Sequence, residues 1–135
     1  MKNITIGIMT RFTELTGGLH NDFYNAIGGR MYDTMAPPEA ATPYAVYNIV
    51  ASNQEWEFVE RFQNILLQIT IVDDSSSGGT IKDTGSSCKT LYENCALTIT
   101  GKTLVFMRWE SEVLFKDDDG SWVMPIDFRL YVKTP

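Results

Sequence analysis

The chain has 135 residues, of which 44% are hydrophobic and 21% are charged, and its formal net charge is −6. This composition predicts one globular domain spanning residues 1–135 and argues against a disordered chain. The acidic balance excludes a protein that grips nucleic acid through its phosphates, because such binding needs an excess of Lys and Arg. The sequence also contains no run of about 18 apolar residues that would predict a membrane span.

Two short helices are predicted at the start of the chain. Residues 2–15 are predicted to be helical because apolar residues at positions 8, 12 and 15 share one helix face, although positions 4, 6 and 8 also alternate as in a strand. Asn21 is a favourable N-cap for a second helix, since its side-chain oxygen can accept from the first free N–H groups. Gly28 and Gly29 end this helix, because glycine adopts the left-handed backbone that a helix stop requires.

The next region is predicted to be rich in strands. Residues 44–52 favour a strand through their β-branched and aromatic side chains. The polar stretch 53–57 is predicted to be a turn or an extended hairpin tip. A second strand is predicted over 58–72, where apolar and polar residues alternate from Ile65 onward, so that one face is buried and one is wetter.

A flexible loop and a third helix are predicted to follow. The small and polar residues 73–79 indicate a loop. Apolar residues at helical spacing predict a helix over 80–95, weakened by Gly85 at a cost of about 1 kcal/mol relative to Ala. This helix holds both cysteines, Cys88 and Cys95, about 10.5 Å apart along its axis. A disulfide needs Cα atoms within about 7 Å, so two buried thiols are expected instead of a bridge.

The C-terminal part predicts a hairpin. Residues 103–115 and 122–132 both alternate between apolar and polar side chains, and Asp119-Gly120 between them is a strong turn signal. The predicted order is helix, helix, strand, strand, helix, strand, strand. This order favours an α+β fold with an antiparallel four-stranded sheet and helices packed on one face.

No residue pattern predicts catalysis, a metal site or a cofactor. His20 is the only histidine and follows two glycines, so it is expected to be exposed to solvent and not to act as a base. The run of Asp117, Asp118 and Asp119 lacks the spaced ligands of a calcium loop and is expected to be a charged hairpin tip. The stretch from Gly78 to Lys82 does not match a phosphate-binding loop. The sequence therefore predicts a protein that is not an enzyme.

The three tryptophans suggest different roles. Trp109 and Trp122 fall on the apolar faces of their predicted strands and are expected in the core. Trp56 lies in an acidic tip, where it is either a partner anchor or locally packed; we favour the anchor, because exposed tryptophans often dominate interface energies. Together with the polar loop that follows the second strand, this tip gives a predicted protein interface. Its residues are Glu55, Trp56, Glu57, Asp73, Asp74, Ser75, Ser76 and Ser77.

The middle of the chain resembles a known family. A glycine pair is followed by an Arg-hydrophobic-Tyr step, a proline-containing loop and a Pro-Tyr that opens a strand. The matching residues are Gly28, Gly29, Arg30, Met31, Tyr32, Pro37, Pro43 and Tyr44. This pattern is similar to the small tail-completion proteins of long-tailed bacteriophages, also called tail terminators or head-to-tail joining proteins, and it covers most of the chain from about residue 18.

The resemblance implies a structural role in the virion. Such proteins form a ring, usually a hexamer, that caps the major tail tube protein and offers a surface to the head-completion or connector protein. Genomic DNA passes through the lumen without specific binding, and no membrane is involved. The resemblance implies a location in the tail or neck of the virion, with assembly in the host cytoplasm. The alternative from the residues alone is a small monomeric or dimeric α+β domain that binds a ligand or regulates; an enzyme ranks third.

Overall fold

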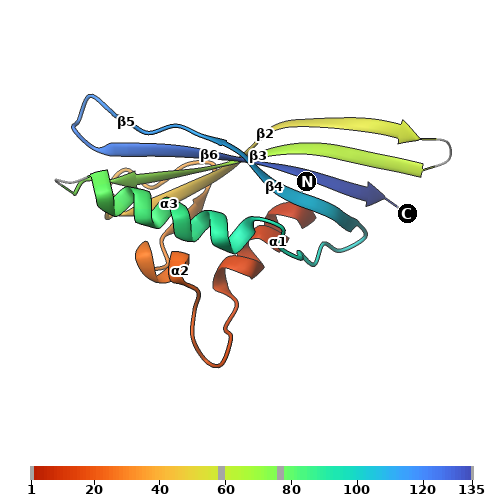
Figure 1. Ribbon diagram of the computed structural model, residues 1–135, viewed down its shortest axis with the longest axis horizontal. Coiled ribbons are helices and arrows are strands. Elements are labelled where there is room, and N and C mark those ends of the chain that lie inside the picture. The colour runs from red at the N-terminus through yellow and green to blue at the C-terminus, as the bar shows by residue number, and fades with distance from the viewer. Residues whose placement is uncertain (1, 58–59, 76–77, 135) are drawn as a thin grey trace.

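In the described part of the chain, three helices cover part of one face of a long, twisted sheet (Figure 1). The computed structural model describes residues 2–57, 60–75 and 78–134. The helices are α1 (Lys2–Thr13), α2 (Asp22–Ala26) and α3 (Gly78–Tyr92). The strands are β1 (Met31–Asp33), β2 (Tyr44–Glu57), β3 (Glu60–Asp73), β4 (Thr103–Glu112), β5 (Phe115–Lys116) and β6 (Trp122–Thr134).

The fold class is α+β, but the prediction of an antiparallel four-stranded sheet was wrong. Within the described residues, the sheet has six strands of mixed orientation in the order β1-β2-β3-β6-β4, and β5 also pairs with β6. The pairs β2–β3, β3–β6, β4–β6 and β5–β6 are antiparallel, whereas β1 runs parallel to β2. The last two predicted strands therefore lie side by side as expected, but β6 sits between β3 and β4.

The N-terminal helices form as the sequence predicts. Helix α1 buries Ile4, Ile8 and Phe12 against the rest of the protein. Asn21 caps α2 by accepting from the Tyr24 backbone N–H at 2.8 Å. The helical prediction is thus confirmed over residues 2–13, because the apolar spacing of 8 and 12 extends back to position 4 and so marks one face of a helix. Leu15, predicted on the same face, lies beyond the end of the helix and is 57% exposed.

The Gly-Gly-Arg step joins the helical layer to the sheet. The backbone N–H of Ala45 donates to the Arg30 carbonyl at 2.9 Å, and the Arg30 Nε donates to the Pro43 carbonyl at 3.0 Å. The arginine side chain therefore fixes the end of the proline loop where β2 begins. This structural role explains why an arginine follows the two glycines.

Gly29 has a left-handed backbone and lies close to the Tyr24 ring. Its φ is 73°, and a Cβ there would lie 2.7 Å from the Tyr24 ring. Gly29→Ala should lower the free energy of unfolding by about 2–3 kcal/mol, because the strain of a left-handed alanine and the steric overlap of its Cβ with Tyr24 add up. Gly18→Ala is the matched control, since Gly18 has φ 81° with nothing within 4 Å of the added Cβ. Equal losses in urea denaturation would contradict the contact with Tyr24.

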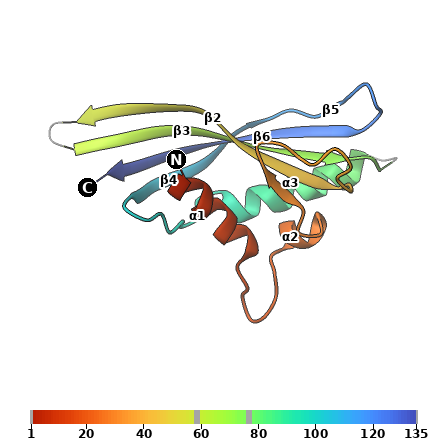
Figure 2. The ribbon, with the colours of Figure 1, turned by 180° about the vertical axis from the view of Figure 1, so that it is seen from behind.

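One apolar cluster lies between the sheet and the helices. It receives the inward side chains of the two central strands, which alternate in exposure along their length. On β3 these are Ile65, Leu67, Ile69 and Ile71, and on β6 they are Met124, Ile126, Phe128, Leu130 and Val132. The opposite face of the sheet carries the alternate residues, and Figures 1 and 2 show no helix covering it.

Several predicted boundaries were wrong. Strand β2 continues through residues 53–57, and β3 extends to Asp73, so neither the turn nor the start of the loop lies where it was predicted. Helix α3 begins at Gly78 and ends at Tyr92, which leaves Cys95 outside the helix. The predicted strand 103–115 breaks after Glu112 and resumes as the short strand β5.

Candidate assembly surfaces

The β2–β3 hairpin extends beyond the part of the sheet that the helices cover (Figures 1 and 2). Its two strands remain paired up to Glu57 and Glu60. Trp56 is 64% exposed near this end, and the guanidinium carbon of Arg61 lies 5.0 Å from its ring centroid. Trp56 and Arg61 are opposite each other across the two strands, so this contact holds the indole in place without burying it.

Aromatic stacking stiffens the same end of the sheet. The Tyr131 ring stacks on Phe62 at a centroid distance of 5.0 Å and on Phe106 at 5.4 Å. The Tyr131 hydroxyl donates to the Glu55 carboxylate at 2.9 Å. The hairpin end is therefore a well-supported strand pair, and it presents Glu55 and Trp56 from a rigid element.

The uncovered face of the sheet carries a polar network around Arg129 and Asp127. Arg129 forms a salt bridge with Glu110 at 3.1 Å and donates to the Asn64 side chain at 2.9 Å. Asp127 accepts from Gln68 at 3.0 Å and from Ser111 at 3.1 Å. Exposed contacts of this kind each add about 0–1 kcal/mol, so they fix the arrangement of this face more than they stabilise the fold.

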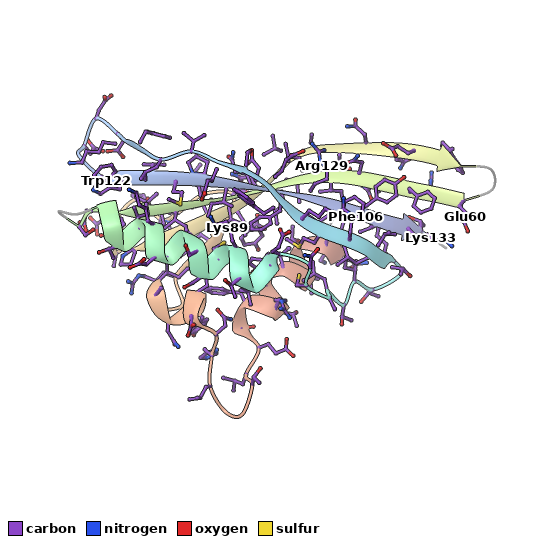
Figure 3. The ribbon with its side chains drawn as sticks, in the orientation of Figure 1. Glu60, Lys89, Phe106, Trp122, Arg129 and Lys133 are labelled. Atoms are coloured by element: carbon purple, nitrogen blue, oxygen red, sulfur yellow. The ribbon has the colours of Figure 1, made fainter. Side chains whose placement is uncertain are left out.

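Ion pairs also mark the end of this face. Lys133 Nζ lies 2.8 Å from Glu60 Oε1 at the same end of the sheet as Phe106, while Arg129 lies closer to its middle (Figure 3). These residues come from three strands that are distant in the chain. Sequence reasoning missed this network, because the pairing depends on the register between β3, β6 and β4.

The predicted interface loop after β3 is only partly described. Asp73 is 3% exposed, and its carboxylate accepts from the Ser75 N–H at 3.0 Å and the Ser75 hydroxyl at 3.3 Å. This aspartate therefore holds the backbone directly after β3. Asp74 is exposed, whereas Ser76 and Ser77 lie outside the described residues. The structure thus does not bring this loop together with Glu55, Trp56 and Glu57, and its role at an interface stays a prediction.

Trp109 and Trp122, the two tryptophans that were predicted to lie in the core, differ in their surroundings. The prediction for Trp109 was wrong: it is 41% exposed at the rim of the sheet, with the Lys89 ammonium 4.7 Å from its ring centroid. Trp122 packs against the core and lies close to Gly78. The position of β4 explains the difference: Trp109 pairs with the buried Phe128 and so lies on the predicted face, but β4 is the edge strand of the sheet, which leaves its side chain partly exposed.

The residues that were considered for catalysis or metal binding, His20 and Asp117–Asp119, make contacts that belong to the fold. His20 is half-buried and stacks on Tyr24 at a centroid distance of 3.7 Å, so the expectation of a solvent-exposed histidine was wrong. Asp117 Oδ1 accepts from the N–H groups of Asp119 and Ser121, as suits a hairpin turn. Within the described ranges, no three His, Cys, Asp or Glu residues gather as a metal site would require.

Both cysteines are free thiols. Cys88 is fully buried, and this burial raises the pKa of its thiol well above its usual range. Cys95 is half-buried, and burial likewise raises the pKa of its thiol. A thiol that stays protonated is a poor nucleophile, so neither group has the character of a reactive cysteine.

A chain of known structure has a similar fold. The fold resembles a chain of a solved structure titled "Virion of native gene transfer agent (GTA) particle", with a TM-score of 0.76 at 14% identity, covering 83% of this chain and 84% of that one. No curated protein sequence matches the chain. None of the helices in the described part of the chain has the length and apolar character of a membrane span.

The projecting hairpin and the uncovered polar sheet face are candidate surfaces for contact with other proteins. The family model described as "Tail completion protein gp17" matches residues 20–133. The chain belongs to this tail-completion family, and it is a structural protein of the virion tail and neck. The resemblance seen in the Gly-Gly-Arg and Pro-Tyr steps is thereby confirmed.

Proposed function

We propose that the chain, as a single tail-terminator-like domain over residues 1–135, assembles into a hexameric ring on the head-proximal end of a finished tail tube. The ring stops polymerisation of the tube protein and offers a docking surface to the head-completion or connector protein. This is a structural activity that needs no catalysis, metal or cofactor. The observation that carries the proposal is the β2–β3 hairpin, which projects beyond the helical layer and presents Trp56 at 64% exposure.

The charge of the chain is compatible with a lumen that DNA crosses. Six copies at −6 each give a ring of −36. Like charges repel, so an acidic ring does not retain passing phosphates, although salt limits the repulsion to about 8–10 Å. Genomic DNA would therefore pass without specific binding.

The alternative of a ligand site between sheet and helices receives less support. Side chains such as Ile69, Cys88 and Ile126 fill this layer and have no exposed surface. The grooves between α1, α2 and α3 instead lie at the protein surface, where Arg11 and Asn21 line one of them. Arg11 already donates to the Leu91 carbonyl at 2.9 Å, and Asn21 to the Phe12 carbonyl at 2.9 Å, so both are engaged in the fold.

Replacing the hairpin end tests the proposal. The triple variant Glu55→Gly, Trp56→Ser and Glu57→Gly should still fold, with a loss of roughly 1–2 kcal/mol, because this end lies beyond the apolar core. In cells that assemble tails, electron microscopy should show overlong tubes or tails that are not joined to heads. The hairpin end would then be required for termination, as expected of an interface placed on a rigid element.

A matched control replaces the other charged hairpin tip. Asp118→Ser with Asp119→Gly alters exposed residues between β5 and β6 without touching the Asp117 carboxylate that holds that turn. This variant should give tails of normal length. If the triple variant also completes normal tails, Trp56 is only packed locally and the proposed role of the hairpin end is wrong.

A further inference from the structure

Strand β2 forms an open edge of the sheet over most of its length. Strand β1 pairs only with Ala45–Tyr47, and in the described part of the chain no strand lies beside β2 beyond that point. An edge strand exposes N–H and C=O groups that can pair with another strand. The last part of this edge, residues 53–57, belongs to the projecting hairpin and includes the exposed Trp56.

The opposite edge of the sheet offers a groove. A space of about 460 Å³ lies beside the first half of β4, lined by residues 94–99 and 102–105. Farther along β4, the chain itself occupies the edge: the Asn94 N–H donates to the Met107 carbonyl, and the Glu93 carboxylate accepts from the Trp109 N–H. The accessible part of this edge is therefore Thr103–Val105, and it lies next to the groove.

The two edges carry opposite charges at the same level of the sheet. Across the strands, Glu55 pairs with Phe62, Phe62 with Lys133, and Lys133 with Thr103. Glu55 therefore lies in the same cross-strand row as Thr103, next to Lys102. Lys102 donates to the Thr134 hydroxyl at 3.1 Å and has no carboxylate partner among the residues described.

Glu55 on the edge strand β2 is the acidic counterpart of Lys102. Within the described ranges, Glu55 accepts from the Tyr131 hydroxyl but has no cationic partner. On β4 itself, Arg108 lies with its guanidinium over the Phe106 ring at 4.3 Å and pairs with no described carboxylate, whereas Glu110 and Glu112 are paired with Arg129 and Lys89. One edge with Glu55 and an exposed indole and another edge with Lys102 beside a groove thus lie on opposite sides of one molecule.

We propose that residues 53–57 of β2 in one copy dock into the groove beside Thr103–Val105 of the next copy. This inference rests on the ring proposed above and assigns its subunit contact. Within the sheet β2 runs antiparallel to β4, so copies in the same orientation continue the sheet with an antiparallel pair. Glu55 then meets Lys102 of the neighbouring copy.

Such a contact uses two different surfaces of the same chain. A contact of this type is heterologous, and repeated copies close into a ring when the rotation per subunit permits. The backbone pairs supply affinity, while the Glu55–Lys102 pair and Trp56 fix the register. The uncovered sheet faces of all copies then lie on the same side of the ring wall and stay available to other partners.

A disulfide between copies tests the contact directly. Within one chain, three strand spacings separate Glu55 from Thr103, about 14 Å, whereas a disulfide needs Cα atoms within about 7 Å. The variant Glu55→Cys with Thr103→Cys, carrying Cys95→Ser to remove the half-buried thiol, is incorporated into tails and then oxidised. A non-reducing gel should show a ladder of covalent multimers that collapses to monomer on reduction.

The control keeps one cysteine and moves the other. Glu39→Cys with Thr103→Cys, in the same Cys95→Ser chain, places the first thiol on an exposed loop outside the proposed contact, and it should give no ladder. If the test variant is present in tails and remains monomeric after oxidation, the proposed contact is wrong. That result would leave tail completion itself untouched, because tail length is read separately by electron microscopy.

Charge reversal gives a second, independent readout. Lys102→Glu should remove most of the protein from purified tails, and adding Glu55→Lys to the same chain should restore it. Lys82→Glu, an exposed lysine on α3, is the matched control and should incorporate normally. If Lys102→Glu incorporates as well as this control, the proposed pair does not exist. If removing the whole protein leaves tails of normal length joined to heads, the proposed function fails instead.

Discussion

We expect Phe12→Ala to lower the free energy of unfolding by about 3–5 kcal/mol, the usual range for removing a buried aromatic side chain. Phe12 has no exposed surface, and its ring centroid lies 5.6 Å from that of Phe23 and 4.9 Å from that of Tyr24. Its removal would leave a cavity between α1 and α2. Chemical denaturation followed by tryptophan fluorescence or circular dichroism measures the loss.

This result bears on how much of the chain makes up the folded unit. Helix α1 precedes residue 20, where the match to the family model begins, yet its inward residues belong to the common core. Ile6→Ala is the control on the same helix, since Ile6 is 52% exposed, and it should cost less than about 1 kcal/mol. If Phe12→Ala costs as little as Ile6→Ala, α1 does not pack on the core as described.

The sequence predicted those elements whose pattern is local and strong. The alternation from Ile65 to Ile71 and along residues 122–132 gave the two central strands with the correct inward faces. Asn21 and the glycine pair gave the second helix and its end, because a cap and a left-handed stop act within a few residues. In each case the decisive interaction lies inside the segment that shows the pattern.

Elements that depend on distant partners were missed. Strand β1 has only three residues, and it forms because Met31–Asp33 pair in parallel with Ala45–Tyr47 across the proline loop. Residues 53–57 are polar and resemble a turn, yet the register with β3 keeps them in the ladder. Propensity is overridden here by tertiary pairing, which a single sequence does not display.

Among the candidate surfaces, one was visible in the local sequence, and the others depend on residues that are distant in the chain. The acidic tip with Trp56 was visible in the sequence as an unusual local composition, and the structure shows that this residue is exposed. The polar network around Arg129 and Asp127 was not predicted, because its members come from β3, β6 and β4. The groove beside Thr103–Val105 also escaped prediction, since it depends on the path of residues 94–99 outside α3.

Trp122 provides the second large expected effect. Its indole carbons lie 3.3–3.5 Å from the position of a Cβ on Gly78, and the Lys116 ammonium lies 4.8 Å from its ring centroid. This side chain therefore fills the space where α3 starts over the sheet, at the end opposite the projecting hairpin (Figure 3). Trp122→Ala should lower the free energy of unfolding by about 3 kcal/mol, near the lower end for a buried aromatic residue, because the side chain is only partly buried.

Two further variants, Trp109→Ala and Trp122→Phe, test the contributions of side-chain burial and of the indole N–H to stability. Trp109→Ala should cost less than about 1.5 kcal/mol, because its side chain is 41% exposed and contacts the Lys89 ammonium at 4.7 Å from the ring centroid. Trp122→Phe should stay within about 1 kcal/mol of the original protein, since the buried Trp122 Nε1 donates to no described acceptor and its removal relieves an unpaired group. Equal losses for Trp109→Ala and Trp122→Ala in urea denaturation would show that Trp109 is as well packed as Trp122 despite its place on the edge strand β4. A large loss for Trp122→Phe would instead show that the indole N–H has a partner in solution.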